Sequence, residues 1–269
     1  MSDPPYTNYH WDAQDYARNS SQQQIWALEL IQKLNLSGDE TVLDVGCGDG
    51  KITAEIAARL PNGSVIGIDI SEDMIRLAQQ SYPTKVFPNL HFQQEDASRL
   101  PFNCEFTTVF SNATLHWLHN PLPALQGIAR SLKYGGNILL QMGGTGNATE
   151  IIRLLDRQIH TGQWAAYFGN FTFPYGFYGP GEYRPWLLEA GLQPSRIELV
   201  LKDMVYPDPA GLTGWLRTTW HPYTQRVPPT QREAFLAELV STYLKEHPLD
   251  EESRTHVQMV RLEVEAFKL

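Results

Sequence analysis

The sequence is poor in cysteine and has no long apolar run, and these shortages exclude several classes of protein. Its 269 residues include only two cysteines, Cys47 and Cys104, whose spacing fits no zinc or redox motif. Two cysteines provide no disulfide framework, which favours a reducing cytoplasm. No segment approaches the ~18 apolar residues of a membrane span, and residues 1–10 lack the basic and apolar parts of a secretion signal. We therefore expect a cytoplasmic protein without a membrane partner or a metal centre.

Basic residues are also in the minority. The chain has 21 Lys and Arg against 30 Asp and Glu, a net charge of −9, and no run of basic residues. A net acidic surface repels polyanions, so we expect no nucleic-acid partner and favour a small-molecule one. Hydrophobic residues make up 42% and charged residues 19%, which is ordinary for a globular protein with a sizeable core. The expected assembly is a monomer or a weak homodimer.

Strands and helices alternate along the first half of the chain, and this alternation predicts the fold. Short apolar runs predict strands over residues 41–45, 64–69, 90–94, 107–112 and 137–142. Helical patterns stand between them at 51–60, after the capping residue Ser71, and at 121–132. Two later strands are expected over 197–206 and 256–267, with a helix at about 182–190. The predicted fold class is α/β: a Rossmann-like, doubly wound, mostly parallel seven-stranded sheet with helices on both faces and a helical, aromatic cap.

The order of the predicted strands and helices also predicts how the chain is divided into a core, a lid and two caps. An arm and helix over residues 1–36 would form a lid. The core would occupy 37–144, continue over 181–206 and end in a strand over 256–269. A cap insertion rich in Tyr, Phe, Gly and Pro is expected over 145–180, and a helical cap over 207–255.

The segment Asp44-Val-Gly-Cys-Gly-Asp-Gly50 stands between a predicted strand and a predicted helix. Glycines there let the backbone turn tightly and approach a ligand, and helix-start amides favour a negative group. The alternative is a loop whose glycines serve packing only. A dinucleotide fingerprint needs a third Gly or Ala where Lys51 stands, and no phosphate-binding P-loop pattern is present. Asp44 suits a cation, such as the ammonium group of a methionine moiety.

Two further acids follow strands. Asp69 ends the second strand about twenty residues after the glycines, where a carboxylate can accept hydrogen bonds from both ribose hydroxyls of a cofactor such as NAD or S-adenosylmethionine (SAM). The alternative for Asp69 is a helix cap, although Ser71 already serves that role. Asp96 follows the third strand and could accept from an adenine amino group; the alternative is a solvated turn acid.

Taken together, these segments resemble the class I SAM-dependent methyltransferase family. The resemblance is carried over residues 38–142 by Asp44–Gly50, Gly67–Asp69, Glu95–Ala97, Phe110–Ala113 and the turn Leu132–Gly136. It implies SAM as cofactor and S-adenosylhomocysteine (SAH) as product, with Gly46 and Gly48 at the methionine end, Asp69 on the ribose and Asp96 at the adenine. The expected cofactor-binding residues are Tyr16, Gln23, Asp44, Gly46, Cys47, Gly48, Asp69, Ile70, Met74, Asp96, Ala97, Asn112, Ala113 and His116.

One segment resembles a particular branch of this family. Ser111-Asn-Ala-Thr-Leu-His-Trp117 resembles the trans-aconitate methyltransferase branch, and Leu115–Trp117 is similar to the insect juvenile hormone acid methyltransferases. The tail adds weaker likeness through Trp215, Arg217, Thr230–Arg232 and Glu246–Pro248. These relatives methylate carboxylates of small acids, so the resemblance implies a small-molecule acceptor and favours a carboxylate oxygen.

The residue inventory suits such an acceptor. A carboxylate, with a pKa near ~4, is already a nucleophile at neutral pH, so it needs placement and hydrogen-bond donors and no general base. The expected catalytic residues are His116, Arg217 and His221, and the expected substrate-binding residues are Trp117, Tyr178, Arg217, Trp220 and Arg226. The alternatives are surface charges for the two arginines and a structural hydrogen bond for His116. With a phenol or alcohol acceptor, His116 or His221 would act as base.

Other activities stay open at this point. The same fold could host a carbon or nitrogen methyltransferase of a natural product, or an enzyme that methylates a carrier-bound malonyl group. A non-catalytic SAM-binding module and an NAD-dependent dehydrogenase are alternatives of other classes. Lys51 and Asp44 argue against the dehydrogenase, and the aromatic insertion argues against a pure binder, although core packing can account for many of these aromatic residues.

Overall fold

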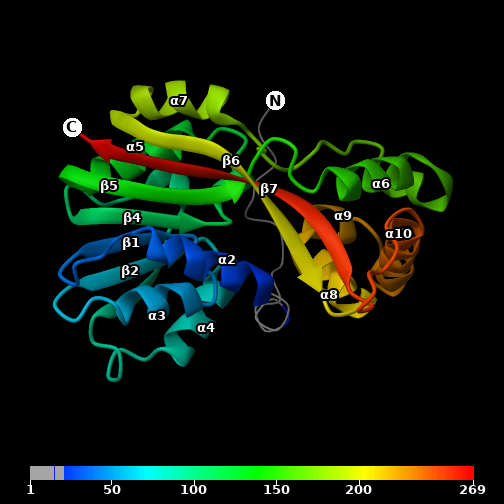
Figure 1. The fold of residues 1–269 in the computed structure, drawn as a ribbon, viewed down its shortest axis with the longest axis horizontal. Helices are drawn as coiled ribbons and strands as arrows, with labels where there is room; N and C mark the ends of the chain where they lie inside the picture. The colour runs from blue at the N-terminus through cyan, green and yellow to red at the C-terminus, as the bar shows by residue number, and fades with distance from the viewer. Residues whose placement is uncertain (1–14, 16–20) are drawn as a thin grey trace. The chain divides into compact units, whose positions relative to one another are not determined.

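A computed structural model describes residue 15 and residues 21–269, and its central feature is one seven-stranded sheet (Figure 1). The strands stand in the order β3-β2-β1-β4-β5-β7-β6. Neighbours among β1 to β5 pair in parallel, whereas β7 is antiparallel to β5. Their bounds are β1 Thr41–Val45, β2 Ser64–Asp69, β3 Leu90–Gln94, β4 Phe106–Asn112, β5 Leu132–Gly143, β6 Leu192–Tyr206 and β7 Thr255–Lys268. The predicted fold class is confirmed.

Helices cover both faces of this sheet because the central strands are apolar on both sides. On one face, α2 (Ser21–Gln32), α3 (Lys51–Ala57) and α4 (Glu72–Ser81) pack Leu30, Ile56 and Ile75 onto strand residues such as Phe110. On the other face, α5 (Leu122–Ser131) and α7 (Pro180–Glu189) bury Leu125 and Leu187 against Val109 and Leu140. Figure 1 shows α2, α3 and α4 in blue to cyan and α5 and α7 in green.

The fifth and sixth strands begin earlier than the sequence predicts. Residues 133–136 were expected to form a turn after the helix, but they lie within β5. Leu132 pairs with Phe106 and Asn137 with Thr108, so the register shifts between the two pairs, and Gly135 takes up the irregularity with a φ of +76°. Similarly, β6 starts at Leu192 because the segment after Gly191 continues directly into the strand.

The chain divides into two compact units. The first comprises Gln23–Thr145, Tyr175–Val200 and Arg261–Leu269, and so holds the larger part of the sheet with α3, α4, α5 and α7. The second comprises the described residues within Met1–Gln22, together with Gly146–Pro174 and Leu201–Val260. Residues 201–206 of β6 and 255–260 of β7 belong to it.

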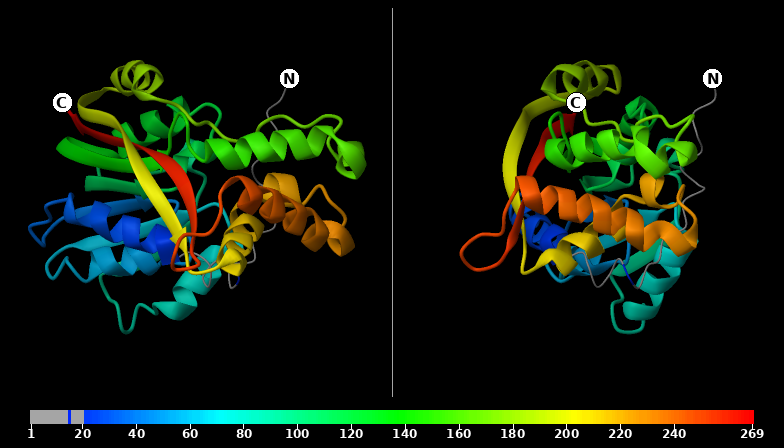
Figure 2. Two further views of the ribbon diagram at one scale, coloured as in Figure 1. Left: turned by 45° about the vertical axis from the view of Figure 1, so that its right-hand side comes forward. Right: turned by 90° about the vertical axis from the view of Figure 1, so that its right-hand side faces the viewer.

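The second unit is mainly helical. It contains α6 (Thr149–His160), α8 (Pro209–Thr219), α9 (His221–Thr224) and α10 (Arg232–Glu246), and α6 and α10 lie side by side (Figure 2). Helix α6 ends at His160, because Thr161 is extended and a 3-10 turn, η4 (Gly162–Tyr167), follows. Among the described residues, no helix is long and apolar enough to cross a membrane.

Candidate cofactor and acceptor site

The glycine loop after β1 is shaped by backbone conformation and by close packing. Gly46, Gly48 and Gly50 all have positive φ, at +80°, +53° and +80°. A Cβ on Gly46 would lie 2.0 Å from the Thr114 hydroxyl oxygen, and one on Gly50 would lie 2.6 Å from the Phe92 ring. Among the residues that the structure describes, a Cβ on Gly48 would meet nothing within 4 Å. Packing therefore accounts for two of the glycines, whereas Gly48 lines open space that a ligand can enter.

Asp69, at the end of β2, ties this loop to the next helix. Its Oδ2 accepts from the Gly48 amide at 3.0 Å, and its Oδ1 accepts from the Ser71 amide at 2.9 Å. Ser71 caps α4 by accepting from the Met74 amide, as the sequence predicts. Burial raises the pKa of Asp69, and the two amides oppose that shift. Because each carboxylate oxygen can accept two hydrogen bonds, Asp69 retains capacity for ribose hydroxyls.

Asp44 differs from its expected role. Its side chain is 2% exposed, and its Oδ2 accepts from the Thr53 hydroxyl at 2.6 Å. Burial raises the pKa of Asp44 to about 7. This shift disfavours the charged form of the carboxyl, so Asp44 is a weaker negative charge for an ammonium group than we expected from the sequence.

Further expected cofactor-binding residues follow β2 and β3, among them Asp96, which was expected at the adenine. Asp96 caps a 3-10 turn, η2 (Ala97–Arg99), with Oδ1 accepting from the Ser98 amide at 2.8 Å and hydroxyl at 2.7 Å. Ile70 exposes an apolar side chain just beyond Asp69, and Met74 is buried in α4. An exposed isoleucine at the carboxyl end of a parallel strand suits the flat face of a base.

A strained turn after β4 closes over the glycine loop. Ala113 has a φ of +57°, and its amide donates to the Gln141 carbonyl at 2.8 Å. Next along the chain, the Thr114 hydroxyl contacts the carbonyl oxygens of Gly46 at 3.3 Å and Asn112 at 3.1 Å. These contacts bring the ends of β1 and β4 together, so Asn112 and Ala113 stand beside the glycine loop as the cofactor assignment requires.

His116 lies in a 3-10 turn, η3 (Leu115–Trp117), and its ring chemistry is set by its neighbours. The Gly143 amide donates to its Nδ1 at 3.3 Å, so the neutral ring carries its proton on Nε2. Burial, together with the positive charge of Arg261, holds the pKa of His116 well below its usual value. His116 is therefore a neutral donor at pH 7, which disfavours the alternative in which it acts as a base.

Aromatic rings surround His116. The rings of Trp117, Tyr175 and Phe177 have centroids 5.8, 6.0 and 5.6 Å from the imidazole. Tyr178, expected to bind substrate, instead packs edge-on against Trp186, and its hydroxyl donates to the His119 carbonyl at 2.5 Å. Trp117 and His116 thus share one aromatic cluster, whereas Tyr178 joins the core beneath it.

The other expected acceptor residues belong to the second unit. Arg217 donates from Nε and one terminal nitrogen to both carboxylate oxygens of Asp15, at 2.8 and 3.0 Å. Trp220 is buried between Trp215 and Tyr223, and His221 is buried in α9. The guanidinium of Arg226 lies over the Phe171 ring, 5.2 Å from its centroid. Two expected cofactor residues add nothing here: Tyr16 lies outside the described residues, and of Gln23 only the backbone, in α2, is described.

Comparison with known proteins shows a methyltransferase domain in this chain. Residues 42–136 match a family model described as "Methyltransferase domain". A trans-aconitate 2-methyltransferase of Azoarcus sp. is 28% identical over 232 residues, which cover 84% of this chain and 87% of that protein. The chain contains a methyltransferase domain and resembles the class I SAM-dependent methyltransferases. It resembles the trans-aconitate branch, as the sequence predicts, and the dehydrogenase alternative is set aside.

Solved structures share the fold of this methyltransferase at low sequence identity. A methyltransferase of Bacillus halodurans superposes with a TM-score of 0.61 at 18% identity, covering 90% of this chain and 98% of that one. The geranyl diphosphate C-methyltransferase of Streptomyces coelicolor, solved with SAH, gives 0.54 at 17% identity, with coverage of 92% and 81%. The open space at Gly48 and the free acceptor capacity of Asp69 fit SAM on this chain's own geometry.

Some residues that shape the methyltransferase site were missed by the sequence analysis. Thr53 holds Asp44, Arg261 depresses the pKa of His116, and Gln141 hydrogen-bonds Glu263 inside the sheet. Gln141 interrupts the apolar run Ile138–Met142, and a lone amide in a buried strand could have marked it. The local sequence around Thr53 and Arg261 does not reveal their roles, because tertiary packing determines which residues they contact.

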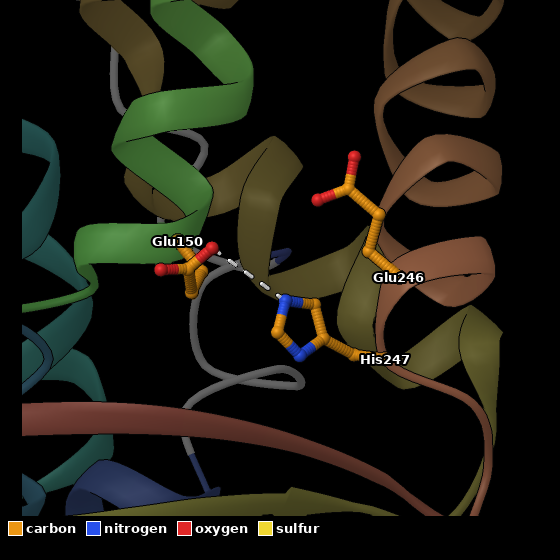
Figure 3. Close-up of side chains that lie close together, drawn as sticks. All are labelled: Glu150, Glu246 and His247. Carbon is orange, nitrogen blue, oxygen red and sulfur yellow. Dashed lines mark ion pairs between the residues drawn. The ribbon is translucent and has the colours of Figure 1, made fainter.

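Two acidic residues and a histidine outside this site have the residue types of a metal site, but their contacts are ionic. Glu150 of α6 lies near Glu246 and His247 at the end of α10 (Figure 3). His247 Nε2 is 3.7 Å from Glu150, and Glu246 pairs with Arg153 and Arg157. Because guanidinium groups already compensate these carboxylates, we assign the group to ion pairing between the two helices.

Proposed function

We propose that this methyltransferase transfers the methyl group of SAM to a carboxylate oxygen of a small acid. The observation that carries the proposal is the state of His116, a neutral donor whose Nδ1 already accepts from Gly143. A phenol, an alcohol or a carbon acid must lose a proton before or during transfer, and this histidine cannot take it. A carboxylate has lost its proton at neutral pH and needs only to be held.

The relatives support the same acceptor class. The similarity to the trans-aconitate 2-methyltransferase of Azoarcus sp. extends over most of both chains, beyond the SAM-binding domain. The enzyme for carrier-bound malonyl groups would also methylate a carboxylate, so a free acid has to be distinguished from a carrier-bound one by experiment. Carbon and nitrogen acceptors fit less well, because they call for a base.

The proposed reaction is a single in-line displacement. SAM, when bound, supplies an electrophilic methyl group on a sulfonium. An oxygen of the acceptor carboxylate forms the new bond to the methyl carbon, the carbon–sulfur bond breaks, and its electron pair stays on sulfur, which gives a methyl ester and SAH. The chain's contribution is alignment, which can supply about 7–11 kcal/mol of the barrier. His116 Nε2–H would donate to the acceptor and orient it without removing its nucleophilic lone pairs.

The pH dependence of kcat/KM follows from the state of His116. The rate should rise with the ionisation of the acceptor, near pH ~4, and then stay flat from about pH 6 to 8. The pH profile of kcat/KM should show no additional rise or fall near the ordinary histidine pKa, because burial keeps His116 neutral throughout this range. His116→Gln keeps a donor and should retain the flat profile. A limb between pH 6 and 7.5 that His116→Gln removes would contradict the proposal and restore the general-base alternative.

Arg217 is the proposed anchor of a second acidic group on the acceptor. Its hold on both oxygens of Asp15 shows that the guanidinium fork takes a carboxylate in this position. Arg217→Ala should raise KM for an acidic acceptor about 10-fold to 100-fold, since hydrogen bonds to charged groups contribute about 1.5–3 kcal/mol. The Kd for SAM should change less than twofold.

Arg184→Ala provides the matched control, because it removes an exposed arginine from α7. It should leave both constants unchanged. If Arg217→Ala altered KM and the Kd for SAM equally, Arg217 would be a structural residue and could not be assigned to the acceptor site.

A further inference from the structure

Three polar residues stand in register across the sheet of the first unit. Asn112 ends β4 and is the register partner of Gln141 in β5, which is in turn the partner of Glu263 in β7. Register partners in a sheet lie about 5 Å apart and on the same face. Two residues earlier on that face, Phe110 and Leu139 belong to the apolar core under α2, α3 and α4. The polar row thus begins where the apolar core stops, at the carboxyl ends of β4 and β5.

Glu263 fixes the orientation of the Gln141 amide. Its side chain is 1% exposed, and its Oε2 accepts from Lys33 Nζ at 2.6 Å and from Arg196 at 2.8 Å. Burial raises the pKa of Glu263, but these hydrogen bonds outweigh burial and hold it below its usual value, so the carboxylate is ionised. An ionised carboxylate only accepts, and its Oε1 accepts from Gln141 Nε2 at 2.9 Å. The amide must therefore turn its NH2 group towards Glu263 and its carbonyl oxygen away.

That orientation leaves unpaired acceptors on two residues that are partners in the sheet register. Gln141 is 2% exposed, and its Oε1 has no hydrogen-bond partner among the residues that the structure describes. The same holds within the described chain for the buried Oδ1 of Asn112, the register partner of Gln141. Buried polar atoms in native proteins are nearly always hydrogen-bonded, so a pair of adjacent unpaired acceptors points to a ligand that donates.

We propose that Gln141 Oε1 and Asn112 Oδ1 accept hydrogen bonds from the α-ammonium group of SAM. An ammonium group has three donors and no acceptor, which suits the acceptor oxygens of two residues that are partners in the sheet register. The Gln141 oxygen cannot donate, so a carboxylate at this position would gain no hydrogen bond from it. Asp44, which the sequence suggested for the ammonium, has its Oδ2 engaged by the Thr53 hydroxyl. The inference rests on the cofactor and is independent of the proposed acceptor, and it makes Gln141 a cofactor-binding residue that the sequence analysis did not include.

A pair of ligands that differ only in the ammonium group tests this inference. SAH and deamino-SAH, in which hydrogen replaces the amino group, are titrated calorimetrically into the full-length protein and into Gln141→Leu. The wild-type protein should bind SAH about tenfold or more tightly than deamino-SAH, as expected for charge-assisted hydrogen bonds. In Gln141→Leu this ratio should fall towards one through weaker SAH binding, with little change for deamino-SAH.

Two further variants keep the test decisive. Gln158→Leu removes another buried amide, in α6, whose Nε2 donates to the Phe235 carbonyl, and it should leave the ligand ratio unchanged. If Gln141→Leu fails to fold, Gln141→Asn takes its place, because its shorter side chain withdraws the oxygen and should also lower the ratio. Equal weakening of SAH and deamino-SAH would make Gln141 a structural residue, and an unchanged ratio would place the ammonium elsewhere; either result overturns the proposal.

Discussion

Replacement of Gly48 by valine is expected to lower the affinity for SAM about 100-fold while the protein stays folded. The open space beside Gly48 would be filled by the new side chain, so the cofactor would lose hydrogen bonds to its charged end, each worth about 1.5–3 kcal/mol. The positive φ of +53° adds strain of about 1–2 kcal/mol, which should lower the unfolding free energy without unfolding the protein. Calorimetric titration with SAM and thermal unfolding measure the two effects separately.

Gly191→Val separates strain from ligand exclusion. Gly191 also has a positive φ, +83°, and a Cβ there would meet nothing within 4 Å in the described part of the chain. It lies between α7 and β6. This variant should lose a similar amount of stability and bind SAM within about twofold of the wild-type protein. If Gly48→Val and Gly191→Val bound SAM equally well, the glycine loop would not be the cofactor site.

Loss of the Asp69 carboxylate is the second large expected effect. Asp69→Ala should weaken binding of SAM about 100-fold or more, because two charge-assisted hydrogen bonds to the ribose would be lost. The nucleoside 5′-methylthioadenosine, which lacks the amino-acid part, should weaken by the same factor. This pattern would distinguish Asp69 from Gln141, whose replacement should affect only ligands that carry the ammonium group.

Asp69 also accepts from the Gly48 and Ser71 amides, so the loop itself has to be monitored. The informative quantity is the preference for 5′-methylthioadenosine over its 2′-deoxy analogue. The wild-type protein should prefer the ribose form, and Asp69→Ala should lose that preference; a loosened loop alone would weaken both ligands and preserve it. Asp73→Ala removes an exposed carboxylate that pairs with Arg76 in α4 and should change neither affinity.

The sequence predicted the sheet well because its strands are short, apolar and bounded by glycine, proline or capping residues. The predicted bounds of β1, β2 and β3 agree with the structure, and Ser71 caps α4 as expected. The early start of β5 was not predicted, because residues 133–136 have the composition of a turn. There, pairing of Leu132 with Phe106 overrides local preference, and Gly135 permits the irregular backbone.

The sequence provides a better basis for predicting where the site residues lie than for predicting their protonation states. Gly48, Asp69 and Asn112 could be assigned to one edge of the sheet because each lies at or just after the carboxyl end of a predicted parallel strand. The protonation of Asp44 and His116 depends on burial and on Thr53, Gly143 and Arg261, and none of these contacts follows from local sequence. The pairing of Arg217 with Asp15 joins residues 202 positions apart, a distance that no local pattern encodes.

Transfer of a methyl label from SAM to small dicarboxylic and tricarboxylic acids tests the account most directly. The purified protein is incubated with methyl-labelled SAM and each acid, with phenols and amines in parallel reactions, and the products are treated with mild alkali. We predict label in the acids as methyl esters, which alkali releases as methanol, and no transfer to the phenols or amines. Alkali-stable label, or transfer to the phenols or amines and not to the acids, would contradict the carboxylate assignment and show that this methyltransferase needs a base other than His116.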